Sequence, residues 1–150
     1  MIKVLRGSER KKILKILDEK FGFNDLKNFY ILKSGKNRIR IISKDFERVD
    51  LRGMRIKFLG LEFGILTKDD EFRLTIEGSQ FVGKGAKKNI LEVERNVGKQ
   101  WMSGRTPRVT GNVENGFVIV KHERHILGCG RYAEGKLWSF VPKWRRVLIF

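Results

Sequence analysis

Cysteine and long apolar runs are almost absent from this chain, and each shortage excludes a class of protein. The 150 residues contain a single cysteine, Cys129, which cannot form an internal disulfide and is typical of a reducing compartment. No apolar run has the length that a membrane-spanning helix needs. The apolar stretch at the N-terminus is too short for a secretory leader. We therefore expect a cytoplasmic protein that makes no contact with a membrane.

Acidic residues are also scarce. Asp and Glu total 17 against 33 Lys and Arg, which gives a formal net charge of +16 and a pI near 10.3. The excess is spread evenly, with 18 basic against 10 acidic residues in 1–70 and 15 against 7 in 71–150. A positive charge of this size is typical of proteins that bind nucleic acid. The alternative is a solvated, lysine-rich surface. The carboxylates are scattered, which does not favour a nuclease.

A packed core is expected, because hydrophobic residues make up 41% of the chain. Residues 8–21 predict a helix, with Ser8 as the N-terminal cap and Gly22 at the stop position. Its apolar stripe has helical spacing. The stripe consists of Ile13, Leu14, Ile16, Leu17 and Phe21. The basic residues outside the stripe form either an RNA-binding face or a solvated one.

Short strands and turns dominate the rest of the first half. A hairpin is predicted over residues 28–42, with its turn at 34–37. Arg38 and Arg40 lie two apart, so they share a face of the second strand and offer two guanidinium groups to phosphate. Further elements are expected as a helical turn at 45–49 and strands at 55–59 and 61–66.

The polar, acidic run at residues 67–71 is the best candidate for a domain boundary. We therefore predict an α+β protein with a small α+β domain at 1–70 and a β-rich domain at 71–150. The second domain is expected to contain two short helices and a basic glycine loop at 83–88. Strands are expected at 72–76, 89–94, 117–121, 125–132, 136–141 and 146–150, and helices at 77–82 and 97–102.

Several sequence blocks of the second half match a known domain. They are Leu74-Thr75-Ile76-Glu77-Gly78-Ser79-Gln80-Phe81-Val82-Gly83, Ala86-Lys87-Lys88-Asn89-Ile90-Leu91-Glu92-Val93, Trp101-Met102-Ser103-Gly104, Gly116-Phe117-Val118-Ile119-Val120-Lys121-His122, Leu127-Gly128-Cys129-Gly130 and Val141-Pro142-Lys143-Trp144-Arg145-Arg146. In these blocks residues 72–147 resemble the PUA domain. The form is that of the PUA-like domain of Sun-type RNA 5-methylcytosine methyltransferases and of its stand-alone relatives, which are labelled ribosome-biogenesis proteins.

The resemblance implies an RNA-binding β pseudo-barrel behind a small pre-PUA-like α/β domain. It also implies where RNA is contacted, which is the short helix with its following loop and the closing segment. On this chain those positions are Gly83, Lys84, Gly85, Lys87, Lys88, Lys143, Arg145 and Arg146. Glycines also let backbone N–H groups approach phosphate. Trp144, Trp138 and Tyr132 are candidates for stacking on unpaired bases, whereas Trp101 is expected in the core.

Catalytic chemistry is not expected from this sequence. A methyltransferase needs a longer chain, and 5-methylcytosine formation needs a nucleophilic cysteine. Cys129 lies between two glycines in a predicted strand, where a small buried residue is expected. His122, His125 and Cys129 supply three metal ligands without a clear fourth. We therefore predict no catalytic residue, no metal and no cofactor.

The expected function is binding of structured RNA, either rRNA or tRNA, by a non-catalytic recognition module in ribosome biogenesis or RNA modification. Its expected partners are the RNA and, beside it, an RNA methyltransferase or pre-ribosomal proteins. Two alternatives stay open. One is a protein-interaction subunit that scaffolds an RNA methyltransferase, and the other is a small RNA-modifying enzyme with an unrecognised site.

Overall fold

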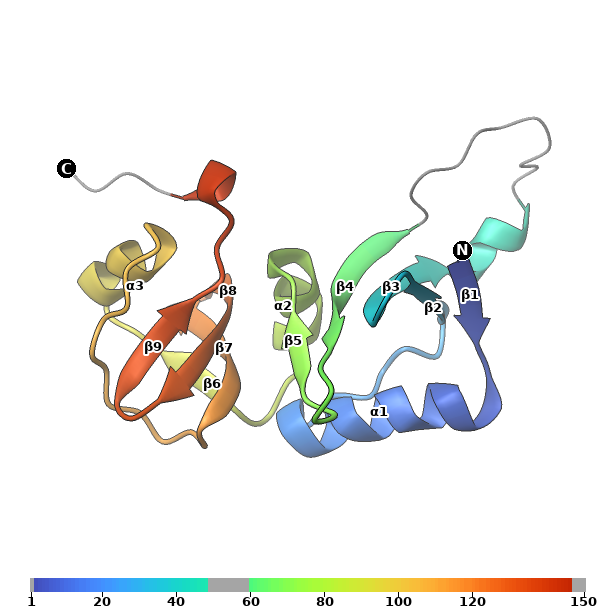
Figure 1. The fold of residues 1–150 in the computed structure, drawn as a ribbon, viewed down its shortest axis with the longest axis horizontal. Coiled ribbons are helices and arrows are strands. Elements are labelled where there is room, and N and C mark those ends of the chain that lie inside the picture. Colours follow the sequence, from blue (N-terminus) through green and yellow to red (C-terminus); the bar gives the residue numbers. More distant parts are fainter. Residues whose placement is uncertain (1, 49–59, 147–150) are drawn as a thin grey trace.

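Two antiparallel-rich sheets placed side by side form this α+β protein (Figure 1). The computed structural model describes residues 2–48 and 60–146. The first sheet has the order β1-β2-β3-β4-β5, and the second has the order β6-β7-β8-β9. The strands are β1 (Ile2–Leu5), β2 (Phe29–Ser34), β3 (Arg38–Ser43), β4 (Leu61–Leu66), β5 (Phe72–Leu74), β6 (Ile90–Glu92), β7 (Gly116–His122), β8 (His125–Ala133) and β9 (Lys136–Ser139). The helices are α1 (Gly7–Phe21), α2 (Ile76–Gly83) and α3 (Arg95–Met102), with 3-10 turns η1 (Lys44–Arg48) and η2 (Lys143–Arg145).

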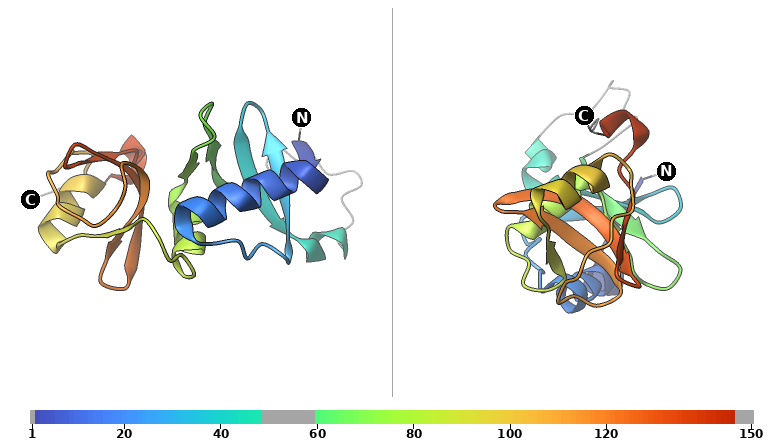
Figure 2. Two further views of the ribbon diagram at one scale, coloured as in Figure 1. Left: turned by 90° about the horizontal axis from the view of Figure 1, so that it is seen from below. Right: turned by 90° about the vertical axis from the view of Figure 1, so that its left-hand side faces the viewer.

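Helix α1 lies along one face of the first sheet (Figure 2). Its apolar stripe explains this, because Ile13, Leu17 and Phe21 are buried while the basic residues around them stay outside. The predicted stop is confirmed, since Gly22 ends the helix in the left-handed region at φ +65°. The predicted cap is wrong. Helix α1 begins at Gly7 and its N-cap position is Arg6, which leaves Ser8 inside the first turn.

The β2–β3 hairpin, η1 and β4 lie where the sequence predicts them, while the strand expected at 55–59 falls outside the described residues. The sequence predicts that strand β5 belongs to the β-rich second half. In the structure it belongs to the first sheet, where it pairs antiparallel with β4 and Leu66 lies opposite Phe72. The reason is the short connection, in which Thr67 N donates to Glu71 O at 2.8 Å and so closes a hairpin. The division into 1–70 and 71–150 stays a prediction.

The second sheet is built on β7 and β8, its two longest strands. Strand β6 joins β7 in parallel, and β9 joins β8 in antiparallel. Helix α3 packs on this sheet through Trp101, which is fully buried, as expected. The strand expected at 146–150 lies almost wholly outside the described residues. The segment just before it forms the 3-10 turn η2.

A hydrophobic cluster joins the two sheets, and a second cluster lies under the second sheet alone. Phe21 and Phe63 from the first part pack in the same cluster as Phe117, Ile119 and Cys129 from the second sheet. Helix α2 lies between the sheets and contacts β4 on one side and β8 on the other (Figure 1). None of the helices in the described residues is long and apolar enough to cross a membrane. Because of this shared cluster, the two sheets pack against each other and their surfaces adjoin.

Candidate nucleic-acid interface

The glycine loop after α2 exposes its lysines but not its backbone donors. Lys84, Lys87 and Lys88 are exposed. The amides of Lys87 and Lys88 donate to Phe21 O at 2.7 and 3.2 Å, and those of Gly85 and Ala86 donate to Val82 O. The idea that this loop offers backbone N–H groups to phosphate is therefore wrong for these four residues, because the amides already tie the loop to α1 and α2.

Gly83 serves packing. A Cβ at this position would lie 2.5 Å from Ile126 Cδ1, so glycine allows α2 to approach β8 closely. Gly85 is exposed, and a Cβ there would only reach ordinary contact with the Phe23 ring at 3.4 Å. What the loop can offer to an anion is thus the ammonium groups of its lysines. Of these, Lys88 Nζ lies 3.4 Å from Glu19 O.

The closing segment, 142–146, presents an aromatic ring among cations. Trp144 is the most exposed large hydrophobic residue described, at 82%. Lys143 and Arg146 beside it are exposed. Arg145 lies over the Trp144 ring, with its guanidinium carbon 5.4 Å from the ring centroid, and it forms an ion pair with Glu77 in the first turn of α2. This ion pair fixes the closing segment to the start of α2.

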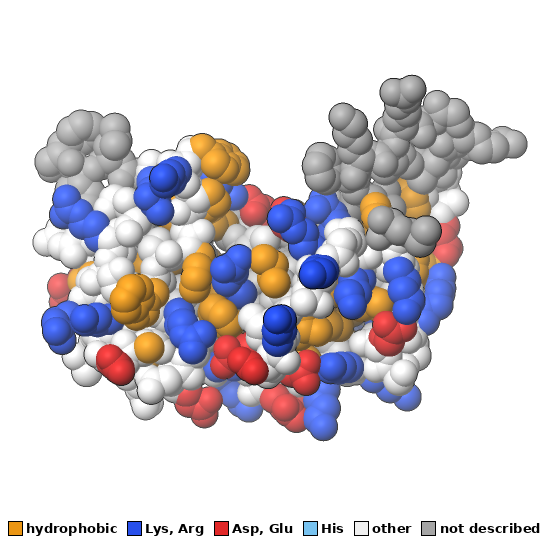
Figure 3. Space-filling model, in the orientation of Figure 1, with side chains coloured by type: hydrophobic (Ala, Val, Ile, Leu, Met, Phe, Trp, Pro, Cys, Tyr) orange, Lys and Arg blue, Asp and Glu red, His pale blue; other side chains and the backbone are white. Residues whose placement is uncertain are grey.

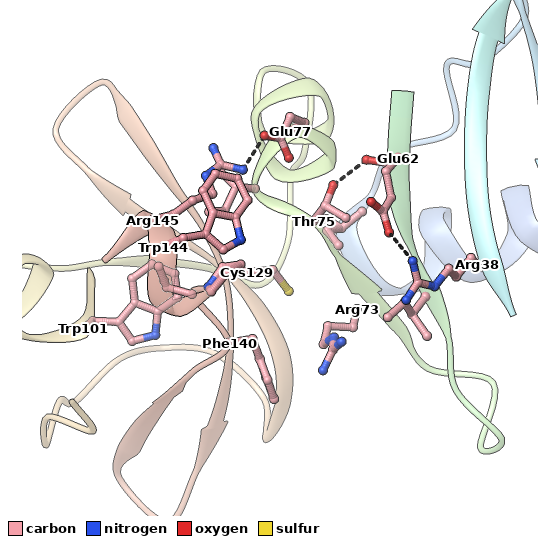
Figure 4. A pocket seen from close by; sticks show the side chains of 15 residues that line it. Arg38, Glu62, Arg73, Thr75, Glu77, Trp101, Cys129, Phe140, Trp144 and Arg145 are labelled. Atoms are coloured by element: carbon pink, nitrogen blue, oxygen red, sulfur yellow. Dashed lines mark hydrogen bonds and ion pairs between the residues drawn. The ribbon is translucent and has the colours of Figure 1, made fainter. Parts of the chain in front are cut away.

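A groove of about 270 Å³ lies between the two sheets, beside the closing segment (Figure 4). Side chains from both sheets, from α2 and from the closing segment line it. They include Arg38, Arg73, Glu77, Phe140, Trp144 and Arg145. In the close-up the guanidinium of Arg73 lies between Phe140 and Arg38. The groove therefore gathers arginines from both halves of the chain beside exposed aromatic rings from the second half.

Arg38 and Arg40 do not form the exposed pair that their spacing predicted. Arg38 lines the groove and stays exposed, 3.6 Å from Glu62. Arg40 is only 8% exposed, and its Nη2 donates to Gly60 O at 3.0 Å. Arg40 is held because β3 is an interior strand of its sheet and the Gly60 carbonyl lies within reach. Arg40 therefore has a structural role and is not available for binding at the surface.

Among the groove residues that the sequence did not predict are Arg73 and Phe140, which contact each other. Arg73 stands over the Phe140 ring at 4.6 Å, and Phe140 is 39% exposed. The signal for Arg73 was present in the sequence, because it alternates with the buried Phe72 and Leu74 and so points to the opposite face of β5. Its contact with Phe140 could not be predicted, because it depends on how the strands pair in the two sheets.

The predicted contact residues lie at two separate places. The lysine loop follows the C-terminus of α2, and η2 meets the N-terminus of the same helix, about 12 Å away for eight residues. In Figure 1 the loop lies at the lower edge and η2 at the upper edge. Figure 3 shows basic and hydrophobic side chains side by side across the middle of this face, with most of its acidic side chains in the lower half. The groove, not the loop, is where charge and aromatic rings coincide.

The remaining candidates are distributed as follows. Trp138 is 47% exposed on β9, whereas Tyr132 packs against the core of the second sheet. Cys129 is buried, and this burial raises the pKa of its thiol to about 12. A thiol with that pKa is protonated at neutral pH and is a poor nucleophile. His122 Nδ1 lies 2.9 Å from Val93 O.

Comparisons with known proteins agree with this fold. The family model described as the methyltransferase RsmF PUA domain matches residues 88–147. The ribosomal RNA small subunit methyltransferase F of Aeromonas hydrophila is 25% identical over 139 residues, which are 93% of this chain and 28% of that protein. The crystal structure of a PUA domain from Aeropyrum pernix K1, a tartrate complex, superposes with a TM-score of 0.55 and 12% identity. That superposition covers 91% of this chain and 73% of the archaeal one.

Residues 88–147 thus match a PUA-domain model, and the chain has the fold of a PUA-domain structure, as the sequence blocks indicated. Within that class, the domain is similar to the PUA domain of the RsmF methyltransferases, and the chain spans 28% of the length of the curated relative it matches. The family model matches a PUA domain, which is an RNA-binding module, and not a methyltransferase domain.

Proposed function

We propose that this chain binds structured RNA, either rRNA or tRNA, as a non-catalytic recognition module in ribosome biogenesis or RNA modification. The PUA fold, the net charge of +16 and the likeness to a ribosomal RNA methyltransferase support this proposal. The first part of the chain then acts as a pre-PUA-like domain in front of the RNA-binding one. The protein works in the cytoplasm, where its RNA partners are assembled and modified.

One observation carries the proposal. An exposed indole, Trp144, stands among Lys143, Arg145 and Arg146 at the mouth of a groove. Aromatic rings stack on unpaired bases, and flanking cations neutralise the phosphates next to those bases. A ring that is 82% exposed contributes little to folding, so its place among cations is best explained by a partner with both bases and phosphates.

The lysines of the glycine loop form a second, purely electrostatic contact in this proposal. Lys84, Lys87 and Lys88 are exposed, and their loop is held in place by its hydrogen bonds to Phe21 O. A loop whose backbone is already fixed loses no backbone entropy when its lysines bind. These lysines therefore set the register of the RNA backbone rather than read its bases.

The chemistry on the RNA is proposed to come from another chain. Cys129, the residue that could have served as a nucleophile, has a protonated thiol inside the core. An RNA methyltransferase is the partner that the relative's name suggests, and pre-ribosomal proteins are the other candidates. The module would present its RNA to that enzyme and needs no cofactor of its own.

The test is a binding titration of the purified protein with tRNA, an rRNA fragment and duplex DNA at several salt concentrations. We expect one RNA to be preferred over DNA. Substitution of Lys84, Lys87 and Lys88 by Ala should weaken binding to all RNAs. The slope of log K against log salt should fall by about 0.7–0.9 for each phosphate that the variant no longer neutralises. Trp144→Ala should reduce the preference between RNAs.

The matched control removes three charges elsewhere, by Lys11→Ala, Lys27→Ala and Lys36→Ala, because these lysines are exposed and form no ion pair among the described residues. An equal loss of affinity in both triple variants, with RNA and DNA bound alike, would contradict recognition and leave general electrostatics. Binding to RNA that appears only with a methyltransferase present would favour the scaffolding alternative instead.

A further inference from the structure

A row of side chains runs across the first sheet toward the second. Arg38 on β3 lies opposite Ile65 on β4, and Ile65 lies opposite Arg73 on β5. Residues directly opposite each other on neighbouring strands project from the same face. The two arginines therefore stand on one face of the sheet with Ile65 between them, and all three line the groove.

Phe140 joins this row to the second sheet. Its ring lies 4.6 Å from the Arg73 guanidinium carbon and 5.8 Å from the Phe117 ring centroid, on β7. Arg73 is thus held over an aromatic ring that also contacts Phe117, a member of the cluster that joins the two sheets. The position of this guanidinium depends on both sheets, and the shared cluster keeps them together.

Unlike the other arginines of the groove, Arg73 has no carboxylate partner among the described residues. Arg38 has Glu62 at 3.6 Å, and Arg145 has Glu77. No carboxylate of the described residues forms an ion pair with Arg73, whose guanidinium stands over the Phe140 ring. A guanidinium that stacks on a ring and has no carboxylate within ion-pair distance keeps its hydrogen-bond donors available to a phosphate.

The size of the groove limits what that anion belongs to. A volume of about 270 Å³ is close to the lower end of small-molecule sites, about 300 Å³. The groove therefore admits one nucleotide-sized group and excludes a stacked duplex. The indole of Trp144 lines the same groove and offers the aromatic surface that an unstacked base requires.

We propose that this groove binds a single unpaired nucleotide of the RNA, with its phosphate at Arg73 and its base against Trp144. This inference rests on the proposed RNA-binding function and adds the kind of RNA segment and the residues that hold it. Phe140 is a positioning residue, since it acts by fixing Arg73. The first sheet thereby contributes to recognition, and RNA that carries a single-stranded end or bulge is preferred over a blunt helix.

The experiment compares two RNAs that share one hairpin stem, one blunt and one with a short single-stranded tail. The wild-type protein should bind the tailed RNA more tightly. Arg73→Ala should weaken binding to the tailed RNA by about tenfold, and to the blunt RNA by much less, because it removes a charge-assisted hydrogen bond to the tail. Arg73→Lys keeps the charge but not the planar fork, and should lie between the two.

The matched control is Arg124→Ala, which removes one exposed arginine from the turn between β7 and β8, outside the groove. It should change the affinity for both RNAs slightly and equally. An abasic nucleotide in the tail tests the base contact. It should weaken the wild-type complex, and it should have little further effect on a Trp144→Ala protein, since both changes remove the same stacking.

The outcomes separate the two proposals. If the wild type binds both RNAs but the tail makes no difference, or if Arg73→Ala weakens both equally, the nucleotide site is refuted and RNA binding stands. If the wild type binds neither RNA, nor tRNA or an rRNA fragment, the proposed function itself fails. Circular dichroism of each variant confirms that these surface substitutions leave the fold intact.

Discussion

Gly130→Ala tests the packing on which the groove depends. Gly130 lies in β8, opposite Ser139 of β9. A Cβ added there would lie 2.8 Å from Trp138 O and 2.9 Å from Trp101 Nε1. These two atoms are the acceptor and the donor of a hydrogen bond of 3.1 Å. The methyl group would therefore enter the space of a buried hydrogen bond, where ordinary contacts begin at 3.4 Å.

The size of the effect follows from three contributions. A buried donor left without its acceptor costs about 1–3 kcal/mol. An extra methyl group in a packed core costs about 1–3 kcal/mol. Replacing glycine in a strand returns about 0.5–1 kcal/mol. We expect a net loss of about 3 kcal/mol of unfolding free energy, or about 6–12 °C in Tm for a chain of this size.

The assay is guanidinium unfolding followed by tryptophan fluorescence and by circular dichroism. Gly85→Ala is the matched control, because its added Cβ meets only ordinary contacts in an exposed loop, and it should stay within about 0.5 kcal/mol of the wild type. In a Trp101→Phe background the hydrogen bond is already absent, so Gly130→Ala should cost clearly less. The reasoning is refuted if Gly130→Ala costs the same in both backgrounds, or costs nothing in either.

Three further predictions concern single hydrogen-bonding or titrating groups. Thr75→Ala removes the cap that accepts from Gly78 N and the hydroxyl that donates to Glu62 O at 2.6 Å, so thermal unfolding should report a loss of about 1–2 kcal/mol. Asn89→Ala removes two hydrogen bonds to backbone groups at a φ of +54°, and a urea titration should show a loss of about 2 kcal/mol, with Asn89→Gly recovering part of it. Cys129 should resist thiol reagents at pH 8 until the protein unfolds. Its raised pKa, from 9.0 to about 12, means that the unfolded chain loses this proton first. Stability should therefore fall from about pH 9 toward pH 12, by about 2 kcal/mol at pH 10.5, and the fall should be smaller in Cys129→Ala.

Local patterns predicted the elements of this protein well. The stripe of α1, its stop at Gly22 and the β2–β3 hairpin all depend on residues close together in the sequence. The sequence blocks that resemble a PUA domain likewise predicted the strands and short helices of the second half. Ser8 failed as a cap because the helix starts one residue before it, a difference that side-chain preferences cannot resolve.

Long-range pairing limited the prediction of the site. The spacing of Arg38 and Arg40 predicted two exposed guanidinium groups on one face. Arg40 is instead buried, because it donates to the carbonyl of Gly60, a residue distant in the sequence. Arg73 entered the groove because β5 pairs with β4, and Phe140 because it reaches over β5 from the other sheet. Such relations depend on sheet register, which the sequence alone does not reveal.

The β4–β5 hairpin makes the chain suited to fragment complementation. Its turn at Lys68, Asp69 and Asp70 is exposed and open to a cut. Cleavage there would leave one fragment with an unpaired edge on β4 and another carrying Phe72, which is buried in the whole protein. Each fragment holds what the other lacks, so the two should reassemble. Attached to separate proteins, they would form a split reporter whose groove between the sheets exists only when both fragments meet.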